Sequence, residues 1–262
     1  MAEPSALRPD PRFAIRDLLI AAAFLTRLPL GSFLEGEAFR PLAAVSWALP
    51  VVGLGLGLVG GLAYGLAQHL GVPVLAAALI AVAVTVLITG GLHEDGLADT
   101  ADGFGGGATR EAKLDIMRDS RSGAFGVLAL IFSVGLRVTS IGALAEVGAV
   151  ISTLVAGHAV SRGILPGLMH YLDPARSEGL GADAGKPDFQ GAALALGIAT
   201  LAAFLCLGLR QGFCAVLLAV LGVAAIGWLA RRHIGGHTGD VLGASQQVAE
   251  VIVLLVAASW AA

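Results

Sequence analysis

Charge and cysteine are scarce in this sequence. Only 13% of the 262 residues are charged, 6% are aromatic and two are cysteines. The two thiols, Cys206 and Cys214, stand eight residues apart in apolar surroundings, which excludes a disulfide framework and a thiolate metal site. The net charge is −3 and no basic stripe with interleaved aromatics occurs, so no nucleic-acid partner is expected.

Hydrophobic residues are abundant instead. They make up 56% of the chain, and the mean hydropathy of +0.85 excludes an ordinary soluble protein. We expect an all-α, polytopic integral membrane helical bundle, one domain over 1–262, embedded in the lipid bilayer. Six apolar stretches are long enough to span and a seventh is short. They cover 42–66, 72–89, 123–144, 147–169, 189–209, 212–230 and, for the short one, 248–260.

The N-terminal region precedes these stretches. Residues 1–12 are polar and proline-rich and are expected to form a flexible tail. Residues 13–30 contain an apolar core too short to cross a bilayer, flanked by Arg16 and Arg27, which predicts an interfacial or re-entrant helix. In the first long stretch Gly53, Gly57 and Gly61 recur every four residues, which favours close helix contact.

Basic residues predict the orientation. With the N-terminus in the cytoplasm, 13 lysines and arginines fall on the cytoplasmic side and only Arg210 on the other, while Arg137 and Arg162 lie within spans. Every long polar connection then faces the cytoplasm. The sequence therefore predicts a multi-pass protein of the cell inner membrane with its active site on the cytoplasmic side.

An acidic segment over 90–122 breaks the apolar pattern. If it begins as a helix, Asp95, Asp99 and Asp102 stand at i, i+4 and i+7 and share one face. Oxygen-only ligands of this kind suit magnesium, manganese or calcium. The alternative is a solvated acidic loop.

Basic residues accompany these carboxylates. Arg118 and Arg121 flank Asp119, and arginines for phosphate beside carboxylates for metal suggest phosphoryl transfer. Within the predicted spans, Arg137, His158 and Arg162 are expensive to bury, so we expect them to face a partner or a substrate anion. For Arg162, snorkelling to the nearby interface is the alternative.

A glycine-rich cytoplasmic loop is predicted over 231–247. Its Gly236, Thr238 and Gly239 offer backbone amides and a hydroxyl to phosphate oxygens, and Asp240 is placed to complete a metal shell. A plain turn is the alternative. The polar segment 171–188 reads equally as a lid over a site or as a connector.

Several motifs together resemble a known family. GGLHEDGLADTADGFGGG from Gly90, MRDSRSGAFG from Met117 and GGHTGDVLGA from Gly235 are similar to motifs of the integral-membrane cobalamin synthases, the adenosylcobinamide-GDP ribazoletransferases. FLTRLP, LPVVGLGLG and GHAVSR match as well, and the likeness runs from about residue 18 to residue 247. Glu94 departs from the family pattern, because an apolar residue is usual there.

The resemblance implies transfer of the adenosylcobinamide phosphate group from adenosylcobinamide-GDP to alpha-ribazole or its 5'-phosphate, with release of GMP and a requirement for Mg²⁺. This is a late step of cobalamin biosynthesis. Whether several copies assemble is left open. The implied roles are Mg²⁺ ligation by Asp95, Asp99, Asp102, Asp119 and Asp240; base or orienting roles for His93 and His237; phosphate contacts by Arg118, Arg121, Arg137 and Arg162; and substrate contacts by His158, Gly236, Thr238 and Gly239.

Two other functions are weighed. Asp99-x-x-Asp102-Gly103 followed by Asp115 and Asp119 echoes the CDP-alcohol phosphotransferases, although the Ala-Arg of that family is missing. A cation or proton transporter is the non-enzyme alternative. Transport carboxylates are expected at mid-span, whereas the acidic segment lies at a helix end or in a loop.

Overall fold

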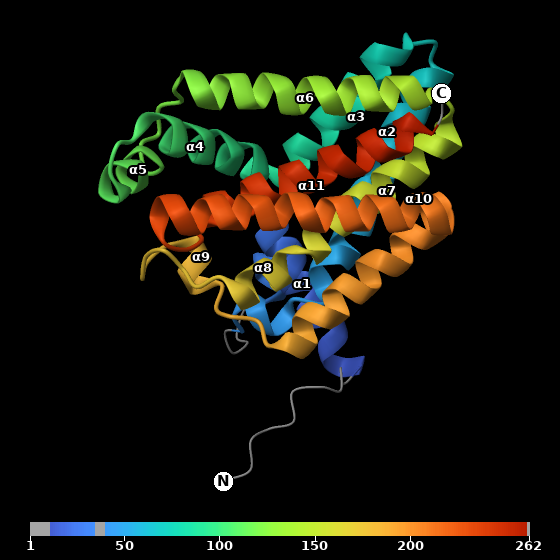
Figure 1. Cartoon of the computed structure of the whole chain (residues 1–262). Coiled ribbons are helices and arrows are strands. Elements are labelled where there is room, and N and C mark those ends of the chain that lie inside the picture. Colours follow the sequence, from blue (N-terminus) through green and yellow to red (C-terminus); the bar gives the residue numbers. More distant parts are fainter. Residues whose placement is uncertain (1–10, 35–39, 261–262) are drawn as a thin grey trace.

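The structure is a computed structural model that describes residues 11–34 and 40–260. Helices dominate these residues, and the single strand-like pairing described is a bridge between Pro174 and His237. Figure 1 shows the long helices packed side by side with short helices at the ends. In chain order the α-helices are α1 Pro11–Leu25, α2 Ala48–His69, α3 Val74–Thr89, α4 Leu92–Gly106, α5 Arg110–Ile116, α6 Ala124–Leu144, α7 Val147–Gly163, α8 Leu165–Tyr171, α9 Leu180–Asp183, α10 Phe189–Ile234 and α11 Gly239–Ser259. Two 3₁₀ turns, η1 Gly31–Phe33 and η2 Leu42–Val45, precede α2.

The predicted membrane bundle is confirmed. Five segments are long and apolar enough to cross a bilayer, and the pair α3 and α4 makes a sixth if it counts as one bent span. α10 is 46 residues long and contains the two stretches predicted at 189–209 and 212–230. It breaks at Gly208, whose φ of 78° and ψ of 167° are not helical. The chain turns back there (Figure 1), and Ala203 and Ala215 from the two limbs share one apolar cluster.

Close helix packing holds the centre of the bundle. α7 and α11 are the most buried of the spanning helices. α2 lies against α7 through the glycines predicted to make such a contact: a Cβ on Gly61 would lie 2.8 Å from Ile151 Cα. In lipid, where helix association depends on packing and hydrogen bonds, small residues allow this approach.

The short N-terminal helix is present and is not among the helices long enough to span. α1 begins at Pro11 and packs Ala21 and Leu25 against the start of α2. Asp17 anchors it by accepting hydrogen bonds from Trp47 Nε1 at 3.1 Å and from Arg40. Ten residues of the predicted tail lie outside the described residues. The interfacial position of α1 stays a prediction.

The prediction of a loop over 231–247 was wrong. α10 continues to Ile234 and α11 begins at Gly239, which leaves four residues as a turn. Gly243 lies within α11, and its glycine is explained by close packing: a Cβ there would lie 3.2 Å from Gly96 Cα of α4. α11 has 21 residues, so the last span is longer than the predicted stretch over 248–260.

Candidate functional site

The acidic segment starts with a sharp change of direction. Gly90 and Gly91 both have left-handed backbone conformations, with φ of 68° and 72°, which glycine adopts without strain. They bend α4 by 90° away from α3. α4 then lies across α11, and Gly96 and Gly243 make the contact: a Cβ on Gly96 would lie 3.2 Å from Gly243 Cα. The bend at Gly90 and Gly91 and the contact between Gly96 and Gly243 thus bring the start of α4 to the start of α11.

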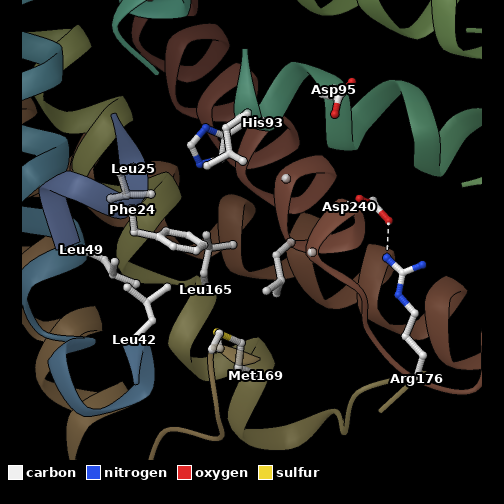
Figure 2. A pocket seen from close by; sticks show the side chains of 15 residues that line it. Phe24, Leu25, Leu42, Leu49, His93, Asp95, Leu165, Met169, Arg176 and Asp240 are labelled. Atoms are coloured by element: carbon white, nitrogen blue, oxygen red, sulfur yellow. Dashed lines mark hydrogen bonds and ion pairs between the residues drawn. The ribbon is translucent and has the colours of Figure 1, made fainter. Parts of the chain in front are cut away.

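A pocket opens beside this contact, shown in Figure 2. One wall is polar and carries His93 and Asp95 of α4, Asp240 of α11 and Arg176 from the connection after α8. The opposite wall is apolar and comes from α1, η2, α2 and α8. Its side chains include Phe24, Leu25, Leu42, Leu49, Leu165 and Met169. The pocket therefore suits a ligand with a charged part and an apolar part.

The predicted helix over the aspartates is confirmed, because α4 runs from Leu92 to Gly106. Asp95 of α4 and Asp240 of α11 both line the polar wall of the pocket, as Figure 2 shows. The charges of Asp95, Asp240 and Asp102 all act on Asp99, and Arg176 opposes them. These carboxylates form a concentrated negative region at the crossing of α4 and α11.

Asp102 has a separate set of partners. Its carboxylate accepts hydrogen bonds from the backbone N–H of Gly123 at 2.6 Å and of Gly126 at 2.9 Å. These N–H groups belong to the start of α6, where backbone donors lack helical partners. Asp102 is buried and caps α6. It does not line the pocket.

The predicted group at 118–121 lies apart from the pocket lining. Arg118 and Arg121 are exposed. Arg121 donates from Nη2 to Asp119 at 2.6 Å, and this hydrogen bonding lowers the pKa of Asp119 to about 2. The structure thus pairs Asp119 with an arginine at the surface, and none of the three residues lines the pocket.

A buried polar network occupies the interior next to the site. Arg137 of α6 pairs with Glu94 at 3.0 Å and with Glu250 of α11 at 3.4 Å. On the other side of Glu250, His158 Nδ1 lies 3.2 Å from its carboxylate and Arg162 lies 4.0 Å away. Gln246, Gln247, Ser133 and Ser161 complete the network with hydrogen bonds.

This network gives partners to the intramembrane residues. Arg137 and Arg162 are each 1% exposed, and His158 is 2% exposed. Their direct ionic partners are the carboxylates Glu94 and Glu250, and none of the three lines the pocket. Glu94, the residue that departs from the family pattern, thus serves as a counter-ion to Arg137.

The turn Gly235–Thr238 is fixed by its neighbours. The Thr238 hydroxyl accepts from Val241 N–H at 3.3 Å, which caps α11, and donates to Asp240 at 3.1 Å. Gly236 fits because a Cβ there would lie 2.9 Å from Ala175 Cα. His237 is 1% exposed, and burial lowers the pKa of its imidazole. Gly239 lines the pocket, whereas Gly236, His237 and Thr238 are not among its lining residues.

Two functional residues escaped the sequence analysis. Glu250 lies in the middle of an apolar helix, which is itself a sign of a buried partner. Arg176 falls in a polar segment that reads as a lid or a connector, and nothing in its spacing links it to Asp240. Its position depends on the pairing between 173–175 and the turn before α11.

Among the described residues, no group of three or more histidine, cysteine or carboxylate side chains stands close enough to hold a metal ion by itself. Mg²⁺ does not need such a group. It is commonly held by one or two carboxylates together with water and substrate phosphate oxygens. Asp95 and Asp240, which lie on the same polar wall of the pocket, have the oxygen chemistry for that mode.

Fold and site together define a polytopic helical membrane protein with an acidic, arginine-containing pocket at one end of its bundle. Sequence comparison then identifies the family. Residues 17–258 match the family model described as cobalamin-5-phosphate synthase, and the chain belongs to that family.

Curated relatives carry one activity name. An adenosylcobinamide-GDP ribazoletransferase of Bradyrhizobium diazoefficiens is 49% identical over 249 residues, which cover 95% of each chain. Proteins with the same name from Mesorhizobium japonicum and Azorhizobium caulinodans are 46% and 41% identical, covering 95% and 92% of this chain and 95% and 94% of the relatives. No solved structure matches the chain.

Proposed function

We propose that this protein is an adenosylcobinamide-GDP ribazoletransferase, which joins an adenosylcobinamide phosphate group to alpha-ribazole or its 5'-phosphate and releases GMP. The names of the relatives support this activity. The observation that carries the proposal is the pocket wall of Asp95, Asp240, His93 and Arg176 facing an apolar wall. Such a pocket matches substrates that combine phosphate groups with large apolar or aromatic parts.

The reaction requires little covalent chemistry from the chain. A free hydroxyl oxygen of the ribose attacks the phosphorus on the cobinamide side of the pyrophosphate, and the bond from that phosphorus to the bridging oxygen breaks, so the bridging oxygen leaves with GMP. To His93, which lines the pocket, we assign the orienting of this hydroxyl and the acceptance of its proton. Phosphoryl transfer of this kind depends mainly on positioning and on stabilising charge.

Asp95 and Asp240 are the residues we propose to hold Mg²⁺, and Asp99, on which their charges act, remains a ligand prediction. When bound, Mg²⁺ supplies charge neutralisation at the phosphate oxygens. Asp102 and Asp119 remain ligand predictions, although the contacts of Asp102 at the start of α6 and of Asp119 with Arg121 favour other roles.

We also propose that the site faces the cytoplasm, with the protein in the cell inner membrane. The support is the basic-residue bias together with the arrangement of the helices. α5, α9 and the turn before α11 lie at one side of Figure 1, and the C-terminus lies at the other. Labelling of a cysteine introduced at Glu178 in whole cells and in inverted vesicles tests this orientation. Labelling in whole cells by an impermeant reagent contradicts it.

The activity test uses purified protein in bilayer nanodiscs with adenosylcobinamide-GDP and alpha-ribazole, with or without Mg²⁺. The expected result is stoichiometric GMP and corrinoid product only when Mg²⁺ is present. CDP-diacylglycerol with glycerol phosphate tests the CDP-alcohol phosphotransferase alternative in the same preparation. CMP release there without GMP release from the first pair overturns the proposal, and proton flux in liposomes tests the transporter alternative.

Variants link the activity to the pocket. Asp95→Asn and Asp240→Asn are expected to lose activity by about 10²–10³-fold, the scale for removing one preorganised electrostatic group. Glu178→Gln is the matched control, because Glu178 is an exposed carboxylate outside the pocket lining. Equal activity of Asp95→Asn, Asp240→Asn and Glu178→Gln places the chemistry elsewhere.

A further inference from the structure

We propose that Arg176 binds the phosphates of the nucleotide-activated donor, an inference that rests on the proposed function. Arg176 lines the polar wall of the pocket together with Asp95 and Asp240, as Figure 2 shows. It is the one lysine or arginine among the described residues that line this pocket. A guanidinium binds phosphate oxygens with two parallel hydrogen bonds, and the geometry assigns that part to Arg176.

The backbone on which Arg176 stands is fixed. Ala175 N–H donates to His237 O at 2.7 Å, and His237 N–H donates to Asp173 O at 2.9 Å. Arg110 of α5 ties the same two segments together by donating to Ile234 O at 2.9 Å and to Ala175 O at 2.5 Å. The residue therefore projects from a clamped segment, as a preorganised binding group must.

The guanidinium of Arg176 has capacity left for a ligand. Nη2 reaches Asp240 Oδ2 at 3.5 Å, which is the limit of a hydrogen bond. Nη1 is buried and has no hydrogen-bond partner among the described residues. Because a guanidinium offers a planar fork of donors, it matches two phosphate oxygens better than one distant carboxylate oxygen.

The other arginines considered for this part are engaged elsewhere. Arg137 and Arg162 are buried beside Glu94 and Glu250 in the interior network. Arg121 pairs with Asp119 at the surface. Arg137, Arg162 and Arg121 do not line the pocket, and neither does Arg118. A phosphate bound in the pocket would therefore contact Arg176.

The donor is the substrate that this arrangement selects. Alpha-ribazole carries no phosphate, whereas adenosylcobinamide-GDP carries the pyrophosphate at which reaction occurs. Loss of Arg176 should therefore weaken binding of the donor and leave binding of the nucleoside acceptor unchanged. A role limited to holding Asp240 in place would lower thermal stability or raise both KM values together.

The experiment compares wild type, Arg176→Gln and Arg176→Lys with the control Lys186→Gln. Lys186 is exposed on the same connection and pairs with Asp173 at 2.7 Å, outside the pocket lining. We expect Arg176→Gln to raise the KM for adenosylcobinamide-GDP at least about 10-fold, with the KM for alpha-ribazole within 2-fold of wild type. Arg176→Lys should recover part of the affinity, because it keeps the charge without the fork.

Binding of GDP and of inorganic pyrophosphate, measured by calorimetry, gives a readout that needs no turnover. Wild type and Lys186→Gln should bind both, and Arg176→Gln should lose at least about 10-fold in affinity. Unchanged donor KM and unchanged GDP affinity in a folded Arg176→Gln variant overturn the inference while the proposed function stands. A wild type that binds GDP through Arg176 yet forms no product overturns the proposed function and leaves the anion site intact.

Discussion

Glu250 of α11 and Arg137 of α6 form an ion pair of 3.4 Å in which both side chains are almost fully buried. Glu250 also meets His158 of α7 at 3.2 Å, so one carboxylate joins three spanning helices. A charge at such depth is costly in a membrane unless it is paired. Glu94 and Glu250 balance Arg137 and Arg162, which makes the network close to neutral.

Removing Glu250 should therefore leave buried cations without counter-ions. We expect Glu250→Ala to lower the free energy of unfolding by about 3–5 kcal/mol, the scale for breaking a buried pair from one side. Thermal unfolding in detergent micelles measures it. Glu178→Ala is the control, because Glu178 is an exposed carboxylate in the connection after α8. Equal melting temperatures for the two variants would show that the buried ion pairs of Glu250 do not stabilise the protein.

The contact between α4 and α11 should resist any added side chain. A Cβ on Gly96 would lie 2.8 Å from the Asp240 carbonyl oxygen and 3.0 Å from Asp240 Cα. Gly96→Ala should therefore separate the two helices and destabilise the protein by about 1–3 kcal/mol, with loss of activity. Gly55→Ala in α2 is the matched control, since its Cβ would meet no described atom within 4 Å. If both substitutions leave stability and turnover unchanged, the close contact is not required.

Asp102 and Asp95 should separate stability from activity. Asp102→Ala removes two acceptor contacts at the start of α6 and should cost about 1–2 kcal/mol, as the loss of a helix cap does. Asp95→Asn should lower activity by about 10²–10³-fold without lowering the melting temperature, because it removes repulsion in the acidic region. Circular dichroism melts beside GMP assays give both quantities. An Asp102→Asn variant that is stable and inactive would instead favour the predicted ligand role.

His237 should make the protein less stable in acid. Burial lowers the pKa of its imidazole below the usual 6.5. The unfolded chain then binds a proton that the folded chain does not, so stability is complete above about pH 6.5 and declines as pH falls toward the lower folded value. The slope from one such group is at most about 1.4 kcal/mol per pH unit. Melting between pH 8 and 5.5 should shift less for His237→Gln than for wild type, and parallel shifts would contradict the assignment.

Helical periodicity and hydropathy predicted much of the architecture. The helical membrane bundle, the short N-terminal helix and the glycine contact of α2 follow from patterns local to each segment, and the structure confirms them. The stretch predicted at 72–89 is long enough to span only together with α4, as a bent pair. The turn before α11 was predicted too long because glycines read as loop formers. In α11 the glycine at 243 is instead explained by the close approach of Gly96, a partner distant in sequence.

The site was only partly predictable for the same reason. Asp95 and Asp240 were selected from their local motifs, and the structure brings them to one pocket. Arg176 depends on a backbone pairing between two distant connections, which no spacing rule reveals. The intramembrane arginines were expected to meet an anion. Their described anionic partners are Glu94 and Glu250, and the position of Glu250 became meaningful only when three helices were seen around it.

α11 carries Asp240 at the pocket and Glu250 in the interior on one unbroken helix. The ten residue steps from one to the other correspond to about 15 Å of axial rise, and each added residue would rotate one end by about 100° relative to the other. An insertion or deletion between these positions would therefore misalign either the acidic pocket or the interior pairing. The register of this segment is a constraint that evolution and protein engineering must both respect.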